Sequence, residues 1–310
     1  MIDVKNLTKM YGTRIAIEDI SFTVAKGEIL GFLGPNGAGK STTMKILTGF
    51  MPATSGTASV CGFDVFNSPM EIKKVIGYLP ENPPVYLEMP VDEYITFVAK
   101  LHDVPKNQLK TRVDYAIEKT ALGDVRKRII GNLSKGFRQR VGLAQAVVHD
   151  PKVLILDEPT VGLDPVQIVE IRELIKSLAG EHTIVLSTHI LPEVTATCQK
   201  ILIINRGKIV AQDLIANLGT SGNYFMTVKK IENAGIEAIS KVAGVEKVSG
   251  TGHQISITLS PGCPDNRDII IETAIKSGLK VLEFGSKSEN LEQVFLKYTS
   301  QDYRQQGDHL

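Results

Sequence analysis

The sequence predicts an α/β fold with a mostly parallel sheet, followed by a smaller α+β domain. Short apolar runs without charged residues, which indicate buried strands, occur at 29–33, 153–156, 183–187 and 201–204. Segments with helical spacing of apolar residues separate these runs. Strands that alternate with helices form parallel sheets covered on both faces, and such sheets bind ligands at the carboxyl ends of their strands. We therefore expect the functional site where these runs end.

The composition indicates a globular chain of about two domains rather than a secreted, nucleic-acid-binding or membrane-spanning one. The 310 residues carry a formal net charge of +1, so no overall field favours nucleic acid or an anionic membrane. Three widely spaced cysteines fit neither a zinc site nor a disulfide framework. The first residues lack a signal-peptide pattern, and no apolar run reaches the ~20 residues that span a bilayer. We expect a cytosolic protein that meets a membrane only through a partner, and we expect no nucleic-acid partner.

Residues 34–41 match the pattern G-x-x-x-x-G-K-[ST] of phosphate-binding loops, between an apolar run and a helical segment. Glycines let the backbone curl so that successive N–H groups converge on phosphate oxygens at the positive end of the following helix. Lys40 would add a charge near the β- and γ-phosphates, and the Ser41 hydroxyl would coordinate Mg²⁺. The candidate nucleotide ligands in this segment are Gly34, Asn36, Gly37, Ala38, Gly39, Lys40, Ser41 and Thr42.

Two later apolar runs end in side chains that suit phosphate chemistry. Asp157 and Glu158 follow the run at 153–156. In a phosphate-loop protein the first acid at such a strand end holds Mg²⁺, directly or through water, and the second can orient or deprotonate an attacking water. A helix cap or a solvated turn is the alternative use of such a pair, but the phosphate loop favours catalysis. His189 lies just past the run at 183–187, where α/β proteins bind ligands.

The segments that flank the phosphate loop predict a smaller sheet. Short apolar stretches over 2–24 indicate antiparallel strands, and a turn followed by a peripheral strand is expected within 49–62. Tyr11 lies in the turn region between the first two strands. Its ring would serve equally well stacked on a purine or packed in the turn, and the sequence leaves both uses open.

A helical region is expected between the two halves of the parallel sheet. A short strand over 76–79 leads into a loop that four prolines keep irregular. Residues 91–148 are then mostly helical in pattern, with breaks at 104–105 and 122–124. Within this region the basic cluster 126–128 is interpreted as a solvated face rather than a nucleic-acid contact.

The texture of the sequence changes at residues 218–223, which predict a linker. The elements expected after it are β-α-β-β-α-β, at 224–228, 231–242, 245–248, 254–259, 268–276 and 279–284. This order predicts a small ferredoxin-like sandwich. A last helix is expected at 291–298 and a polar tail at 300–310. No catalytic set is evident in this half, and His253 and Cys263 are interpreted as ordinary residues.

Residues 133–140, with the sequence LSKGFRQR, complete an ordered set of motifs. The set comprises Tyr11, the phosphate loop, the loop containing Glu81, Ser134 and Gly136, Asp157 and Glu158, Asp164 in a Gly-Leu-Asp segment, and His189. With this set, residues 2–215 resemble the nucleotide-binding subunit of an ATP-binding-cassette (ABC) transporter. The LSKGFRQR form and the GYLPE loop look most like export-type subfamilies, which include drug-resistance, copper-processing and gliding-motility transporters.

The resemblance implies a phosphate-loop ATPase core with an antiparallel β-subdomain and a helical signature subdomain. It places an ABC nucleotide-binding domain at 1–218, with its helical subdomain at 83–150. A C-terminal accessory α+β domain would occupy 219–299, and a polar tail 300–310.

The same resemblance implies a cytoplasmic ATPase, peripheral on the cell membrane, that uses ATP and Mg²⁺. Ser134 and Gly136 would close over the γ-phosphate bound by a second copy, so that two ATP molecules lie in a head-to-tail dimer. Hydrolysis would open the dimer and move a separate membrane permease, outward in export-type members. The implied roles are metal binding by Ser41, Asp157 and Glu81, water activation by Glu158, a γ-phosphate contact by His189, and signalling across the dimer by Asp164.

Three positions depart from the family pattern. Glu81 stands where the family commonly has glutamine, and it adds a negative charge beside an acidic site. Lys135 and Phe137 replace the usual glycine and glutamine of the signature, so the ribose contact of that glutamine is not carried over to Phe137. Residues 81–94 are either the dock for the permease or a simple connector.

Two other functions compete with transport. The first is a soluble ABC ATPase that acts on ribosomes or DNA, but such proteins usually carry two cassettes or a long coiled-coil insertion, and neither is evident here. The second is a degenerate regulatory module. The presence of Lys40, Asp157, Glu158 and His189 argues against it.

Overall fold

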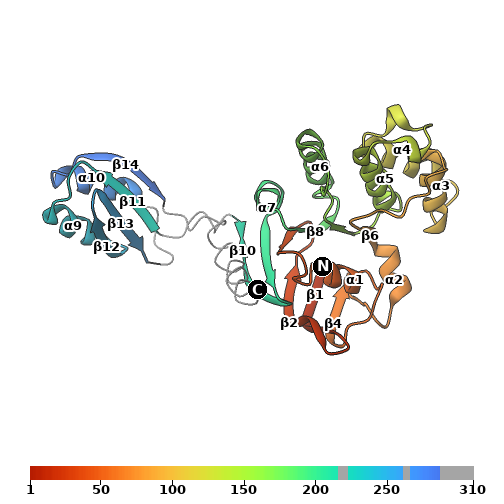
Figure 1. The fold of residues 1–310 in the computed structure, drawn as a ribbon, viewed down its shortest axis with the longest axis horizontal. Coiled ribbons are helices and arrows are strands. Elements are labelled where there is room, and N and C mark those ends of the chain that lie inside the picture. The colour runs from red at the N-terminus through yellow and green to blue at the C-terminus, as the bar shows by residue number, and fades with distance from the viewer. Residues whose placement is uncertain (216–222, 261–265, 287–310) are drawn as a thin grey trace, which may run out of the picture. The chain divides into compact units, whose positions relative to one another are not determined.

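The computed structural model describes residues 1–215, 223–260 and 266–286. These residues fall into two compact units that divide between Asp213 and Leu214, close to the predicted boundary after residue 218 (Figure 1). Each unit has an apolar core of its own. Within the described ranges, no helix is long and apolar enough to cross a bilayer.

The first unit is built on a six-stranded sheet with buried central strands. Its order is β10 (Lys208–Leu214), β9 (Lys200–Asn205), β3 (Ile29–Leu33), β8 (Thr183–Thr188), β7 (Val153–Asp157) and β6 (Ile76–Leu79). β3 pairs in parallel with β8 and β9, and β7 pairs in parallel with β8 and β6. Every residue of β3, β7 and β8 is buried, as continuous apolar runs require. The predicted mostly parallel sheet is confirmed, and its order sets the ends of β3, β8 and β7 side by side.

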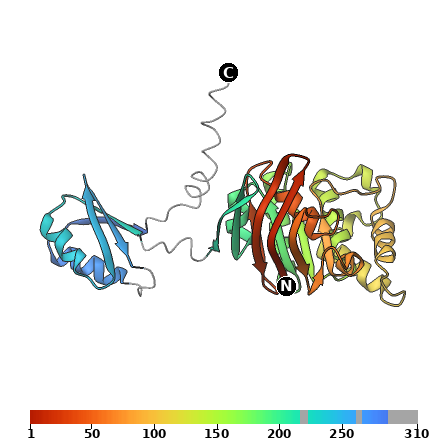
Figure 2. The ribbon, with the colours of Figure 1, turned by 90° about the horizontal axis from the view of Figure 1, so that it is seen from below.

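A second sheet holds the N-terminal strands and the peripheral strand after the loop helix. Its order is β2 (Arg14–Val24), β1 (Ile2–Tyr11), β4 (Ser55–Val60) and β5 (Phe63–Asp64), all antiparallel. Figure 2 shows its strands, in red to orange, side by side. The helix α1 (Lys40–Leu47) contacts strands of both sheets, and Met44, Ile46 and Leu47 are completely buried there. One apolar core therefore holds the phosphate-loop helix between the two sheets.

The predicted helical region forms three helices that pack on one another. They are α3 (Val91–Leu101), α4 (Leu109–Lys119) and α5 (Lys135–Val147), with short 3-10 turns at Gly123–Val125 and Ile130–Asn132. Figure 1 shows them standing together in yellow and green. The remaining helices of this unit are α2 (Pro69–Val75), α6 (Pro165–Leu178) and α7 (Leu191–Thr197). α6 buries the four apolar residues that its spacing placed on one face: Ile171, Leu174, Ile175 and Leu178.

The second unit has the predicted element order β-α-β-β-α-β. Its elements are β11 (Asn223–Val228), α9 (Asn233–Ser240), β12 (Val245–Thr251), β13 (Gln254–Leu259), α10 (Arg267–Lys276) and β14 (Val281–Ser286). The strands form an antiparallel sheet in the order β12-β13-β11-β14, an order that agrees with the predicted ferredoxin-like sandwich. Most of the predicted linker, the helix expected at 291–298, the tail and Cys263 lie outside the described residues.

Candidate functional site

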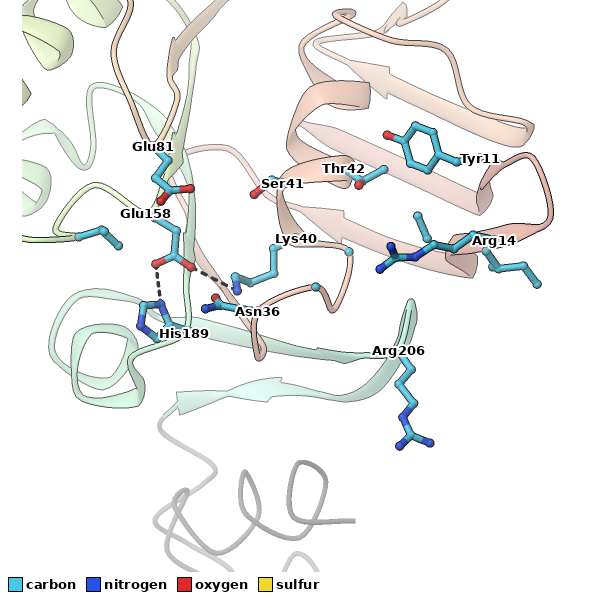
Figure 3. Close-up of a pocket in the computed structure, with 15 residues that line it drawn as sticks. Tyr11, Arg14, Asn36, Lys40, Ser41, Thr42, Glu81, Glu158, His189 and Arg206 are labelled. Carbon is cyan, nitrogen blue, oxygen red and sulfur yellow. Dashed lines mark hydrogen bonds and ion pairs between the residues drawn. The ribbon is translucent and has the colours of Figure 1, made fainter. Parts of the chain in front are cut away.

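A pocket of about 790 Å³ opens where the central strands of the parallel sheet end. Asn36 comes from the loop after β3, Glu158 from the end of β7, and His189 from the end of β8. The predicted site residues that line the pocket are Tyr11, Asn36, Gly37, Gly39, Lys40, Ser41, Thr42, Glu81, Glu158 and His189 (Figure 3). Segments far apart in the sequence therefore converge on one cavity at the expected sheet edge.

Two glycines of the phosphate loop are required by the close approach of neighbouring backbone. A Cβ on Gly34 would lie 2.3 Å from the carbonyl oxygen of Ile204, and a Cβ on Gly39 would lie 2.6 Å from that of Ala16. Gly39 also has φ +109°, a conformation that side chains disfavour. Gly34 and the buried Ala38 were predicted as ligands, but neither lines the pocket. They lie at the packed base of the loop.

Lys40 begins α1 and is held beneath the loop. Its Nζ donates hydrogen bonds to the carbonyl oxygens of Gly34 at 2.7 Å and Pro35 at 3.2 Å. The same nitrogen lies 3.2 Å from Oε1 of Glu158. Only 5% of Lys40 is exposed, so its charge acts in surroundings of low dielectric, where electrostatic interactions are strong. The ammonium group therefore lies between the phosphate loop and Glu158.

Glu158 adopts an unusual backbone conformation for a residue with a side chain. Its φ is +52°, in the left-handed region, and its backbone N–H donates to the carbonyl oxygen of Ser187 at 2.9 Å. Its Oε2 lies 2.9 Å from Nδ1 of His189, while Oε1 faces Lys40 (Figure 3). Strained residues of this kind cluster at functional sites, where the surrounding structure holds them. The carboxylate thus contacts both a lysine and a histidine at the carboxyl ends of β7 and β8.

Asp157 is the buried carboxyl at the end of β7. Burial raises the pKa of Asp157 above its ordinary value, and the nearby hydroxyls of Ser187 and Ser41 oppose this shift. Although these hydroxyls are close, Oδ1 of Asp157 has no hydrogen bond of acceptable geometry among the described residues. A buried oxygen without a partner is costly unless a ligand satisfies it.

A magnesium ion fits this arrangement better than a metal held by the protein alone. The described residues contain no cluster of three or more His, Cys, Asp or Glu that would form a complete metal site. Mg²⁺ is usually bound by one or two carboxylates together with substrate phosphates and water. The donor set of Asp157 and the Ser41 hydroxyl, beside the phosphate loop, has that composition.

Tyr11 lies at the other end of the pocket, at the end of β1. Its ring is 46% exposed and lines the cavity. The hydroxyl contacts Sδ of Met51 at 3.1 Å, and Nζ of Lys9 lies 5.2 Å from the ring centroid. The exposed face leaves room for a stacked base, while the neighbours hold the ring in its turn, so both uses of Tyr11 are compatible with the geometry.

Sequence reasoning missed five residues of the pocket lining. They are Arg14, Ile15, Ala16, Val161 and Arg206. Arg14 pairs directly with Tyr11 across the tight turn between β1 and β2, so the hairpin signal alone would have brought it to the pocket. Arg206 lies in the turn after β9, and no local pattern in the sequence connects that turn with the phosphate loop.

The comparisons with known proteins agree with this geometry. A family model described as ABC transporter matches residues 17–161. The chain is 34% identical to the uncharacterized ABC transporter ATP-binding protein YhcH of Bacillus subtilis, over 97% of this chain and 96% of that protein. The chain belongs to the ABC transporter ATP-binding proteins. It is the ATP-binding subunit of such a transporter, and its enzymatic activity is that of an ATPase.

A second relative of this ATP-binding subunit has a named transport role. The bacitracin transport ATP-binding protein BcrA of Bacillus licheniformis is 32% identical, with 96% of each chain covered. This name favours a transporter subunit over the competing soluble ATPase that acts on ribosomes or DNA.

Solved structures share the fold of the first unit. The cbiO1 protein from Clostridium perfringens, described as part of the ABC transporter complex cbiONQ, has a TM-score of 0.65 and 28% identity, with 70% of this chain and 89% of that chain covered. A dimeric ATP-binding cassette, MJ0796 bound to ADP and Pi, has a TM-score of 0.63 with 69% and 99% covered. At 22% identity the second similarity shows the fold alone.

The signature residues of this ATP-binding subunit lie outside the pocket. Ser134 caps α5, since its Oγ accepts a hydrogen bond from the Phe137 N–H at 3.4 Å. Asp164 caps α6 in the same way, accepting from the Gln167 N–H at 2.9 Å. A Cβ on Gly136 would lie 2.7 Å from the Gln167 side chain, so the starts of α5 and α6 are packed together. These residues therefore lie together at the two helix starts, and none of them lines the pocket.

The predicted docking loop borders a separate groove. This groove, of about 550 Å³, is lined by Pro80, Asn82 and Pro84 from the loop, together with Phe50 and Tyr78. Phe50 is 74% exposed. The described residues thus form a mostly apolar groove beside the loop, residues 81–94, for which contact with a permease was one of two predicted uses.

The base of the groove contains a pair of stacked histidines. The rings of His102 and His149 are 3.8 Å apart at their centroids and nearly parallel. Burial lowers the pKa of His149 to about 4, and it also lowers the pKa of His102. Both rings are therefore expected to be neutral at neutral pH, and a neutral imidazole is more stable than a charged one in such buried surroundings.

Proposed function

We propose that this ATPase powers a separate membrane permease, in the outward direction, by forming a head-to-tail dimer around two ATP molecules with Mg²⁺. The single observation that carries the proposal is the position of Glu158, which bridges Lys40 and His189 in the pocket at the strand ends. A carboxylate in this position is within reach of the terminal phosphate that the loop and Lys40 would bind.

The predicted site residues have distinct parts in this mechanism. The loop N–H groups and Lys40 bind and orient the phosphates, and Tyr11 stacks on the base. Glu158 accepts a proton from the attacking water or orients it, while His189 contacts the γ-phosphate and keeps the carboxylate in place. Asp157 and Ser41 would hold Mg²⁺, which would neutralise charge on the phosphate oxygens.

Glu81 is the proposed additional metal contact. It is exposed and lines the same pocket, so its carboxylate can approach the metal directly or through water. It adds negative charge where the family commonly has a neutral amide.

The placement of Ser134, Gly136 and Asp164 supports a composite site. These residues lie at the starts of α5 and α6, away from the pocket of their own chain. Helix starts carry partial positive charge and free N–H groups, which favour a phosphate. In a C₂ dimer each copy would present this surface to the other copy's γ-phosphate, so both sites form together. The dimeric MJ0796 cassette, which has the same fold, is consistent with this assembly.

The groove beside residues 81–94 is the proposed permease dock. Its apolar lining and the exposed Phe50 suit insertion of an apolar segment of a membrane partner. This assembly would hold the subunit on the cytoplasmic face of the membrane as a peripheral protein. The outward direction is proposed from the resistance and transport names of the relatives, such as bacitracin transport for BcrA.

The Glu158→Gln variant tests the proposed mechanism. The amide keeps the shape of the side chain but cannot accept a proton, so ATP should bind normally and hydrolysis should slow by about 10²–10³-fold. Bound ATP would then persist, and size-exclusion chromatography with ATP and Mg²⁺ should show a dimer that the parent chain does not accumulate. Hydrolysis by the variant at the parental rate would refute the role of Glu158. Slow hydrolysis without any dimer would refute the composite site.

A further inference from the structure

Glu193 is a buried carboxyl that the proposed mechanism does not use. It lies in the first turn of α7 and is 1% exposed. One of its oxygens, Oε2, accepts a hydrogen bond from Oγ1 of Thr188 at 2.8 Å. The other, Oε1, accepts a short hydrogen bond from Oγ1 of Thr160. Both threonines are themselves almost completely buried.

The two threonines belong to the segments that carry the proposed catalytic groups. Thr188 directly precedes His189, and its carbonyl oxygen accepts a hydrogen bond from the N–H of Gly34, the first residue of the phosphate loop, at 3.3 Å. Thr160 is two residues beyond Glu158. One carboxyl group therefore connects the ends of β7 and β8 directly, and it connects the phosphate loop through Thr188.

A purely structural role would not require a carboxyl group at this position. Burying a carboxylate is costly, and within the part of the chain that the structure describes Glu193 has no ion pair to offset that cost. An apolar side chain would fill the same space without the penalty. What the carboxyl supplies is two acceptors in a fixed geometry, which set the positions of two loops relative to each other.

We infer that Glu193 is a positioning residue that keeps Glu158 and His189 in register with each other and with the phosphate loop. The inference rests on the proposed roles of those two residues. A displacement of about 1 Å in a catalytic group can reduce a rate by about 10²-fold, so small shifts of these loops matter. The phosphate loop would bind ATP through its own N–H groups and Lys40, so ATP binding should depend much less on Glu193.

The first test compares Glu193→Ala with Val194→Ala in the full-length chain. Val194 is completely buried on the same helix and packs against Gly31, so its truncation loosens α7 but leaves the carboxyl in place. Glu193→Ala should lower kcat by about 10²-fold with KM for ATP changed less than about threefold. Val194→Ala should lower the melting temperature while each folded molecule keeps the parental kcat. Equal kcat values for the two variants would overturn the inference.

Conservative variants keep the test decisive if Glu193→Ala folds poorly. Glu193→Gln retains one acceptor oxygen. Its amide N–H group can donate a hydrogen bond to a reoriented threonine hydroxyl, so this variant should keep most of the parental kcat. Thr160→Val removes one hydroxyl, which bonds Glu193, at nearly constant shape and should lower kcat by about 10-fold, without adding to the effect of Glu193→Ala in the double variant. Independent, additive effects would overturn the inference.

A readout without hydrolysis separates this inference from the proposed mechanism. The imidazole C–H signal of His189 in NMR spectra, assigned by its loss in His189→Gln, should move or broaden in Glu193→Ala and stay in place in Val194→Ala. An unmoved signal in Glu193→Ala overturns the inference even if hydrolysis is slow. If Glu158→Gln hydrolyses ATP normally while the His189 signal moves as expected, the proposed base is wrong and the positioning by Glu193 stands.

Discussion

The proposed catalytic carboxylate, Glu158, has a strained backbone. A left-handed conformation at a residue with a side chain costs roughly 1 kcal/mol or more, and it persists only where neighbours enforce it. At Glu158 the enforcing contacts are the N–H bond to Ser187 and the contacts of the two carboxylate oxygens with Lys40 and His189. The neighbouring carboxyls of Asp157 and Glu158 are both buried, but only that of Glu158 lines the pocket.

The adjacent carboxyl gives a stability prediction with a defined sign. Burial raises the pKa of Asp157, so the contribution of this group to stability is present below its unfolded pKa and is lost as pH rises through the folded pKa. The charged group thus destabilises the nucleotide-free chain at neutral pH. Asp157→Asn should raise the melting temperature at neutral pH without Mg²⁺ and nucleotide, and the gain should shrink as the pH is lowered.

The exposed Asp124 provides a matched control for that measurement. Asp124→Asn removes the same charge from the surface and should leave the melting temperature nearly unchanged. A melting temperature of Asp157→Asn at or below the parental value at neutral pH would contradict the argument.

The starts of two helices carry the residues of the proposed dimer contact. α5 and α6 each begin with a side-chain cap, Ser134 and Asp164, and the two starts pack together through Gly136 and Gln167. Lys135 lies over the neighbouring loop, since a Cβ on Gly162 would be 2.1 Å from its Nζ. The departure from glycine at position 135 thus places a cation at this surface.

Two variants of Asp164 separate its helix-capping role from its proposed signalling role. Asp164→Ala removes the acceptor for the Gln167 N–H and should lower the free energy of unfolding by about 1 kcal/mol, whereas Asp164→Asn keeps an equivalent cap. Denaturant unfolding of both variants measures this difference. If Asp164 signals across the dimer through its charge, Asp164→Asn should slow ATP hydrolysis at parental stability. Parental hydrolysis by Asp164→Asn would limit the residue to its cap.

The basic cluster 126–128 forms ion pairs within the helical subdomain. Arg126 pairs with Asp114 at 2.7 Å, and Lys127 pairs with Asp92 at the start of α3. The cluster therefore ties α3 and α4 to the segment that follows them. These pairs support the interpretation as a solvated structural face rather than a nucleic-acid contact.

At the scale of the whole molecule, the proposed dock and the pocket are connected through one loop. Pro80, Asn82 and Pro84 line the groove while Glu81 lines the pocket, so one short segment reaches both sites. The exposed Tyr86 packs edge-on against Tyr94 of α3, with ring centroids 5.9 Å apart. A partner in the groove would therefore act on the helical subdomain and on the pocket together.

Photocrosslinking tests the dock. A photoreactive phenylalanine analogue at position 86 should crosslink to the co-expressed permease, because the ring is exposed and lies two residues beyond Pro84, which lines the groove. The same analogue at Phe66, which is also exposed but lies outside residues 81–94, serves as the matched control. Equal crosslinking at the two positions would reduce residues 81–94 to a connector.

The parallel sheet, the phosphate loop and the order of the segments that carry the proposed catalytic groups could be predicted from the sequence alone. These features depend on local information: a short charge-free run bounded by turn residues is typical of a strand buried on both faces, and the loop pattern is contiguous. Asp157, Glu158 and His189 were predicted for the same reason, since each follows such a run directly.

Only the tertiary structure decided which of these groups touch. The order of β3, β8 and β7 cannot be read from the chain, because the pairing of β3 with β8 joins residues more than a hundred positions apart. That order brings Lys40, Glu158 and His189 into contact, adds Arg206 to the pocket, and allows Glu193 to bond threonines in the segments after β7 and at the end of β8. Burial and hydrogen bonding between distant segments are properties of the packed chain, and no local pattern encodes them.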